Sequence, residues 1–277
     1  MKPQAKDMLV RYFVMAYALS WLVFVPLALD HQGIIDLLPH TRYRASWIEL
    51  VHALGGFGPL LAAVLVLRWN GTPAQRSWYR AAYASGRMSA TSWLLAFSPL
   101  GLFALAWVAA MLFAGGIDLH QAFRAQGVVD TTTLAIWVVP LFTYGFGEEA
   151  GWRGFALPIL HRHRSPLRAT LVLGTLWALW HLPLFFYRFA FGAGTAIGFL
   201  LGVLSGALLL TALYNRARGA MLATSCWHLT WNLVSTIDKN GFLSAFMSTV
   251  VMLVAVVLLI RPGRLSSPHG PVTFPMP

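Results

Sequence analysis

Apolar runs of about twenty residues recur along the whole chain, separated by short segments that contain charged or turn-forming residues. A helix of that length, rising ~1.5 Å per residue, spans the hydrocarbon layer of a bilayer. Only 10% of the 277 residues are charged and 58% are hydrophobic, whereas soluble domains carry roughly a quarter charged residues. We therefore predict an all-α polytopic membrane protein.

Eight transmembrane spans are predicted from these runs and from the residues that interrupt them. They are Leu9–Leu29, Ile48–Trp69, Trp93–Ala114, Leu134–Leu160, Leu167–Tyr187, Thr195–Tyr214, Ala220–Ile237 and Phe242–Ile260. Together they are expected to form a single transmembrane domain over residues 1–260, with a motif-bearing core at 134–237. The segment 261–277 is rich in Pro, Ser and Gly, so we expect a disordered cytoplasmic tail.

The basic residues are divided unequally between the two sides of the predicted bundle. Fourteen of the twenty Lys and Arg residues lie on the side of the N-terminus, five lie on the other side, and Arg153 lies within a span. This bias favours cytoplasmic positions for both termini, and residues 160–164 are predicted to form a solvated basic loop at the lipid surface. Despite the net charge of +11, no basic stripe with interleaved aromatic residues is present, which argues against nucleic-acid binding.

Three charged residues fall inside the fourth predicted span, in the run Gly-Glu-Glu-Ala-Gly-Trp-Arg-Gly. An ionised group in mid-membrane costs at least a few kcal/mol, so such groups usually face the bundle interior and serve a function. Glu149 and Arg153 are four residues apart and can pair on one helix face. Glu148 points about 100° away from Glu149 and is left to face another helix.

Two histidines and an asparagine are predicted at similar depth in neighbouring spans. His181 lies in the fifth span, and His228 shares a helix face with Asn232 in the seventh. At ~1.5 Å per residue, Glu148 and these residues lie roughly 12–21 Å from the same membrane face, so one polar cluster is compatible with the spacing.

A carboxylate beside two imidazoles has several chemical uses. The carboxylate can activate a water, and the histidines can hold that water, bind a metal or stabilise an oxyanion. Glu148, His181 and His228 also match the ligand types of a catalytic zinc, although the contiguous His-Glu-x-x-His pattern is absent. The residues therefore leave the need for a divalent metal such as zinc open.

Other residues are interpreted as structural. The lone Cys226 excludes an intrachain disulfide and is expected to be an apolar filler. Small residues at four-residue spacing in and before the sixth span predict a close helix-packing face; they are Gly192, Gly194, Gly198, Gly202 and Gly206.

The three motifs on separate spans resemble those of the CPBP family, which contains CAAX prenyl endopeptidases, Rce1-like proteins and bacteriocin-processing or immunity proteins. The first is Glu-Glu-x-x-x-Arg at 148–153, the second joins Trp177 to His181, and the third joins His228 to Asn232. Trp177 stands where many members have Phe. The surrounding residues are most similar to bacterial members, so the resemblance implies a bacterial inner membrane.

The resemblance implies an all-α intramembrane endopeptidase. It assigns Glu148 as the water-activating base assisted by His181, His228 and Asn232 as oxyanion donors, and Glu149 and Arg153 as supporting residues. The expected partners are the lipid bilayer and a peptide or protein substrate, either membrane-associated or lipidated. Metal dependence differs among descriptions of the family and is not settled by the resemblance.

Two other classes of function are weighed against the peptidase. A transporter or immunity protein could keep the same polar cluster as a binding site, but the internal repeats typical of transporters are not visible in the sequence. A membrane cytochrome could use His181 and His228 as axial haem ligands, but it would leave Glu148, Glu149 and Arg153 unexplained.

Overall fold

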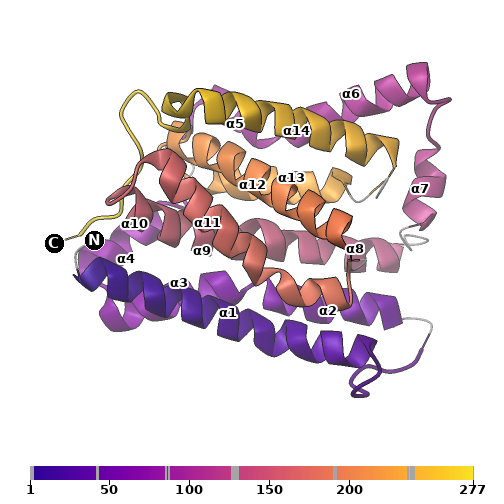
Figure 1. Cartoon of the computed structure of the whole chain (residues 1–277), viewed down its shortest axis with the longest axis horizontal. Coiled ribbons are helices and arrows are strands. Elements are labelled where there is room, and N and C mark those ends of the chain that lie inside the picture. Colours follow the sequence, from indigo (N-terminus) through magenta and orange to yellow (C-terminus); the bar gives the residue numbers. More distant parts are fainter. Residues whose placement is uncertain are drawn as a thin grey trace.

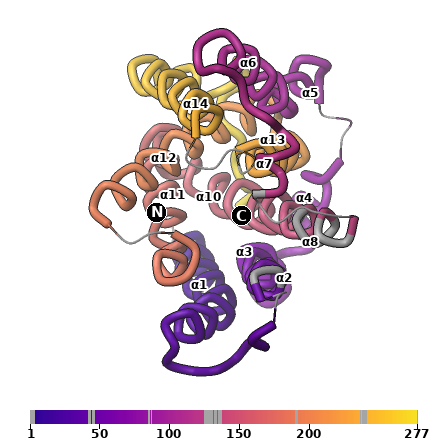
Figure 2. Tube along the Cα trace, turned by 90° about the vertical axis from the view of Figure 1, so that its right-hand side faces the viewer, coloured from indigo at the N-terminus to yellow at the C-terminus, as the bar shows by residue number. Residues whose placement is uncertain are grey.

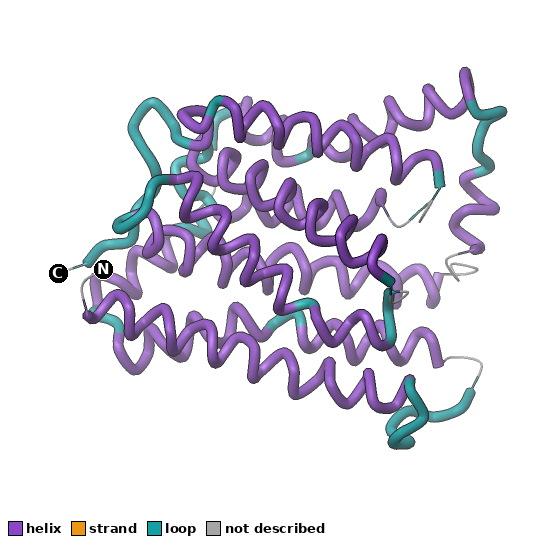
Figure 3. Tube along the Cα trace, viewed as in Figure 1, coloured by secondary structure: helices purple, strands orange, loops and turns teal. Residues whose placement is uncertain are grey.

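The computed structural model describes residues 3–41, 44–84, 86, 88–125, 131–189, 192–235, 237 and 241–276. Within these ranges the chain is built from helices and connecting segments, without β-strands (Figure 3). The helices are α1 (Pro3–His31), α2 (Arg44–Gly55), α3 (Gly58–Asn70), α4 (Pro73–Ala81), α5 (Ala90–Ala96), α6 (Ser98–Phe113), α7 (Leu119–Ala125), α8 (Thr131–Phe142), η2 (Thr143–Glu148), α9 (Glu149–Gly151), η3 (Trp152–Ala156), α10 (Leu157–His161), α11 (Pro166–Trp180), η4 (Leu182–Phe186), α12 (Ala193–Arg216), α13 (Met221–Ser235), α14 (Phe242–Ile260) and η5 (Pro262–Leu265).

The all-α membrane architecture is confirmed, but the count of eight spans is not. Among the described residues, five helical stretches are long and apolar enough to cross a membrane, and α5 with α6, bent by 52°, makes a sixth. The fourth and seventh predicted spans are missing from this set. The fourth carries Glu148, Glu149 and Arg153 and is divided into five short helices, while α13 has only 15 residues.

Residues 131–161 form one helical path through the middle of the bundle, from α8 to α10, which we call the motif helix (Figure 1). It contacts α2 and α3 on one side and α13 on the other. Seen end-on, α1 lies outside the α2–α3 pair, and α14, α5 and α6 lie beyond α13 (Figure 2). The charged residues of the motif helix are therefore surrounded by other helices rather than by lipid.

The second span is broken between α2 and α3, where the motif helix crosses it. Pro59 has no N–H, so the carbonyl of Gly55 loses the helical donor four residues ahead. The Ser20 hydroxyl of α1 donates to that carbonyl instead (2.8 Å). Because irregular backbone at membrane depth needs protein partners, this break is tolerated only inside the bundle.

Glycines allow the motif helix to approach its neighbours closely. A Cβ added at Gly147 would lie 2.6 Å from the carbonyl oxygen of Gly56, in the break between α2 and α3. A Cβ at Gly145 would lie 2.7 Å from the carbonyl oxygen of Ser225 on α13. Two residues of the motif thus fix how near the second and seventh spans come to the polar residues.

The glycines of α12 were predicted to form a close helix-packing face, and the structure shows no such packing among the described residues. Among the described residues, nothing lies within 4 Å of a Cβ built at Gly194, Gly198, Gly202 or Gly206. The N-terminal half of α12 is exposed on that side, because the helix diverges from the bundle before its buried residues begin at Ser205.

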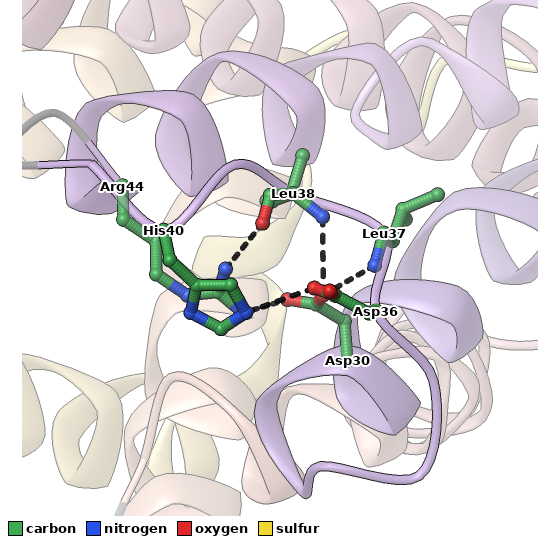
Figure 4. A network of polar contacts seen from close by, with 6 residues as sticks. All are labelled: Asp30, Asp36, Leu37, Leu38, His40 and Arg44. Atoms are coloured by element: carbon green, nitrogen blue, oxygen red, sulfur yellow. Dashed lines mark hydrogen bonds and ion pairs between the residues drawn. The ribbon is translucent and has the colours of Figure 1, made fainter.

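The connection between α1 and α2 is ordered by the buried carboxylate of Asp30 (Figure 4). Oδ1 of Asp30 accepts the backbone N–H groups of Leu37 (2.7 Å) and Leu38 (3.1 Å). Its Oδ2 accepts from Arg44 at the start of α2 (2.6 Å). A single side chain therefore satisfies turn donors and fixes the position where α2 begins.

The segment after Arg261 was expected to be disordered, and in the structure it packs against the bundle instead. Leu265 and Phe274 are fully buried. The side chain of His161, expected in a solvated loop, is also buried and donates to the carbonyl of Val272 (2.9 Å). Leu265 and Phe274 anchor the segment although the rest of it is rich in Pro, Ser and Gly. The composition alone did not indicate these two contacts.

We expect Gly147→Ala to lower the thermal unfolding temperature in detergent, because the new methyl group meets a backbone atom that cannot move aside. Overpacking of this kind typically costs about 1–3 kcal/mol. Gly202→Ala is the matched control: its methyl group meets nothing, so stability should be unchanged or higher, since Ala is favoured over Gly in helices by up to about 1 kcal/mol. Equal effects of the two substitutions would contradict the close approach at Gly147.

Candidate functional site

Two π-helical turns interrupt the motif helix on either side of the charged residues. The first, η2, ends at Glu148, and the second, η3, begins at Trp152. Such turns are rare and occur frequently at functional sites. They separate the directions of the side chains within the motif, so that Glu148 and Glu149 face different neighbouring helices.

Glu149 and Arg153 form the ion pair that their spacing predicts. Arg153 Nη1 donates to Glu149 Oε1 at 2.8 Å, and both side chains are completely buried. The same carboxylate oxygen accepts from Nδ1 of His228 on α13 at 3.0 Å. Glu149 therefore joins the motif helix to α13.

Glu148 faces α11 and meets an aromatic residue there. The indole Nε1 of Trp177 donates to Glu148 Oε2 at 2.7 Å, and the Glu148 side chain is only 3% exposed. The Arg153 guanidinium lies over the ring of the same tryptophan, 4.3 Å from its centroid. Trp177 is thus in contact with two of the three charged residues of the motif.

Trp177 is the member of the cluster whose role the sequence reasoning missed. Phe, which many family members have at this position, has no donor that could reach Glu148. The signal was present in the sequence, because an indole N–H buried in hydrocarbon needs an acceptor.

His181 lies where α11 gives way to the 3₁₀ turn η4. Pro183 cannot supply a helical N–H, and the His181 N–H turns to the carbonyl of Ala178 (3.1 Å). This leaves the Trp177 carbonyl free, and the ring of His181 donates to it through Nδ1 at 2.7 Å. That hydrogen bond fixes the tautomer and leaves Nε2 as the acceptor nitrogen.

His181 and His228 both lie against Trp177. The ring centroids are 5.8 Å apart for Trp177 with His181, and 5.5 Å apart for Trp177 with His228. Asn232 follows His228 by one turn of α13 and is half-buried. The three predicted motifs thus come together in space around one indole, but His228 binds Glu149 rather than Glu148.

The site was also tested against the metal-ligand set suggested by the residue types. Within the described part of the chain, no three His, Cys, Asp or Glu side chains lie close enough together to hold a metal ion. One oxygen of Glu148 is occupied by the indole, and Nδ1 of His228 is occupied by Glu149. As arranged, the described side chains do not bring three metal ligands together.

Comparison with known proteins places the polar cluster within a family. Residues 130–234 match the family model described as Type II CAAX prenyl endopeptidase Rce1-like. No curated protein matches the chain. The matched segment contains every residue of the cluster and extends from α8 to α13. The part of this membrane protein that carries the cluster therefore belongs to the Rce1-like family of type II CAAX prenyl endopeptidases.

Proposed function

We propose that the chain is an intramembrane endopeptidase in which Glu148 activates the water that attacks the peptide bond. The observation that carries this proposal is the division of labour between two adjacent buried carboxylates. Glu149 is neutralised by Arg153 and bonded to His228, whereas Glu148 forms no ion pair among the described residues. Glu148 is thus the carboxylate available to take a proton from water.

The neighbouring side chains support the remaining roles. His181, whose Nδ1 donates to a carbonyl, offers Nε2 as an acceptor that can share the water with Glu148. His228, oriented by Glu149 through Nδ1, presents Nε2 one turn from the Asn232 amide. The Asn232 amide can donate to the oxygen that becomes negative when the tetrahedral intermediate forms, and Nε2 of His228 can do the same when the ring carries a proton on both nitrogens.

The substrate we propose is a peptide or protein segment that reaches the site within the membrane, with or without a lipid anchor. The family assignment implies a peptide substrate in the membrane. We further propose one transmembrane domain over residues 1–260 with both termini cytoplasmic, in a bacterial inner membrane. In support, α1 begins and the described chain ends at the same end of the bundle (Figure 1). The segments predicted on the side of the N-terminus carry most of the basic residues.

Glu148→Gln is expected to abolish cleavage by the purified protein without lowering its thermal stability, because the amide keeps the size but cannot act as a base. Cleavage is measured with a peptide library that contains lipidated and unlipidated members. Asp7→Asn, which makes the same chemical change at a half-exposed carboxylate of α1, should leave cleavage unchanged. Full activity of Glu148→Gln would remove Glu148 from the role of base.

Trp177→Phe should retain the fold and lower kcat by about tenfold, since it removes one charge-assisted hydrogen bond that holds the carboxylate. The comparison is Trp107→Phe, which removes an indole donor from α6, far along the chain from the motifs. Both variants are measured with the peptide that the wild-type protein cleaves best. An unchanged kcat for Trp177→Phe would show that the indole contact does not position Glu148.

Arg153→Ala should destabilise the protein strongly, because it leaves the Glu149 carboxylate buried without its cation. Breaking a buried pair in this way typically costs about 3–5 kcal/mol. Arg11→Ala breaks an ion pair of the same i,i+4 spacing, Arg11 with Asp7, in which both side chains are about half exposed; its cost should stay below about 1 kcal/mol. Thermal unfolding in one detergent compares them, and similar losses would contradict the structural role of Arg153.

A further inference from the structure

The C-terminal segment is held against the motif helix mainly through its main chain. Residues 271–276, which we call the tail peptide, have no helix or turn. Asn215 Oδ1 accepts the N–H of Val272 (2.8 Å), and the His161 ring donates to the carbonyl of the same residue (2.9 Å). The N–H of Phe274 donates to the carbonyl of Pro158 (3.1 Å), near the end of the motif helix.

Two further side chains complete the contacts. Arg162 Nη1 donates to the carbonyl of Phe274 (3.1 Å), and Gln75 Nε2 donates to the carbonyl of Pro275 (2.9 Å). These five hydrogen bonds end on main-chain atoms of the tail peptide, and one more, from Gln75 Nε2 to Met276 Sδ (3.6 Å), ends on a side chain. The main-chain contacts are available to any extended chain, whatever its side chains.

Phe274 is the most deeply buried side chain of the tail peptide, and Val272 and Met276 pack against the core beside it while remaining partly exposed. Phe274 is fully buried, with its ring 5.1 Å from that of Trp78 and 5.6 Å from that of Phe155. Its neighbour Thr273 is exposed. The surface formed by Gln75, Trp78, Phe155, Pro158, Arg162 and Asn215, which we call the tail-binding surface, thus suits an extended peptide with one aromatic residue.

Part of the tail-binding surface lies on the same helix as Glu148, about two turns further along the chain. Phe155 follows Glu148 by seven residues, about 10 Å along the motif helix, and three extended residues cover the same length. Tyr79, next to Trp78 on α4, donates to the carbonyl of Ala150 (3.2 Å). The tail-binding surface and Glu148 are therefore linked through one helix, and α4 contacts that helix between them.

We propose that the tail-binding surface is a docking site for the polypeptide substrate, and that the tail peptide occupies it intramolecularly. This rests on the proposed function, because docking serves cleavage. A segment joined to the bundle by a short connection competes at an effective concentration in the millimolar range. The tail peptide therefore holds back peptides that bind weakly and yields to substrates that also engage the intramembrane site.

The test measures binding of a fluorescent peptide with the sequence of residues 270–276 to the full-length protein in detergent. The Phe274→Ala variant should bind it at least about tenfold more tightly than the wild type, because its own tail loses the buried aromatic anchor. Thr273→Ala, which changes the exposed neighbour, should behave as the wild type. Equal binding by Phe274→Ala and the wild type, or no binding by either, would overturn the proposal.

Hydrogen exchange gives a second measurement on the unaltered protein, which keeps the test valid if Phe274→Ala does not fold. Millimolar peptide should raise deuterium uptake in residues 266–276 of the wild type, while a peptide with Ala in place of Phe should not. Unchanged uptake with the aromatic peptide counts against displacement of the tail.

The kinetics of cleavage separate docking from a purely structural clamp. Docking predicts that Phe274→Ala lowers KM with kcat unchanged, whereas a lower kcat with unchanged KM would refute it. The binding assay is repeated with the Glu148→Gln protein, because peptide binding can be measured without hydrolysis. Binding without cleavage by any wild-type preparation would thus refute the peptidase and leave the docking surface standing.

Discussion

The buried carboxylate of Glu149 is the interaction on which the arrangement of the site depends. It accepts from Arg153 on its own helix and from His228 on α13. A charge at this depth is tolerated only when its partners are fixed. The contact between Glu149 and His228 therefore sets the distance between the motif helix and α13. It also orients His228, and the guanidinium in turn lies against Trp177. Glu148 forms no ion pair among the described residues, which is the basis for proposing it as the base.

The irregular backbone of the bundle serves the same end. The break between α2 and α3, the π turns of the motif helix and the 3₁₀ turn after α11 all lie around the polar cluster. Each frees carbonyl groups, and specific side chains satisfy them: Ser20 at Gly55 and His181 at Trp177. The side chain of His181 thus satisfies a backbone carbonyl and is at the same time held in a fixed position in the polar cluster.

The polar cluster is also connected to the C-terminal end of the motif helix. Tyr79 bonds to Ala150 beside the ion pair, and the C-terminal segment binds around Pro158 and Phe155. A disturbance of α4 or of the tail has a short path to Glu148 through packed, hydrogen-bonded groups. The docking site that we propose lies at this end of the motif helix.

The sequence by itself determined the membrane class, six of the span positions, the Glu149–Arg153 pair and the residues that would meet. These follow from hydropathy and from helical spacing, which are local properties of the chain. Only the tertiary structure decided that Trp177 bonds to Glu148, that His228 turns to Glu149, that the α12 glycines have no close neighbour among the described residues, and that the tail is anchored by Phe274. These depend on how π turns, a proline break and close glycine contacts rotate one helix against another, and no periodicity along the sequence encodes that rotation.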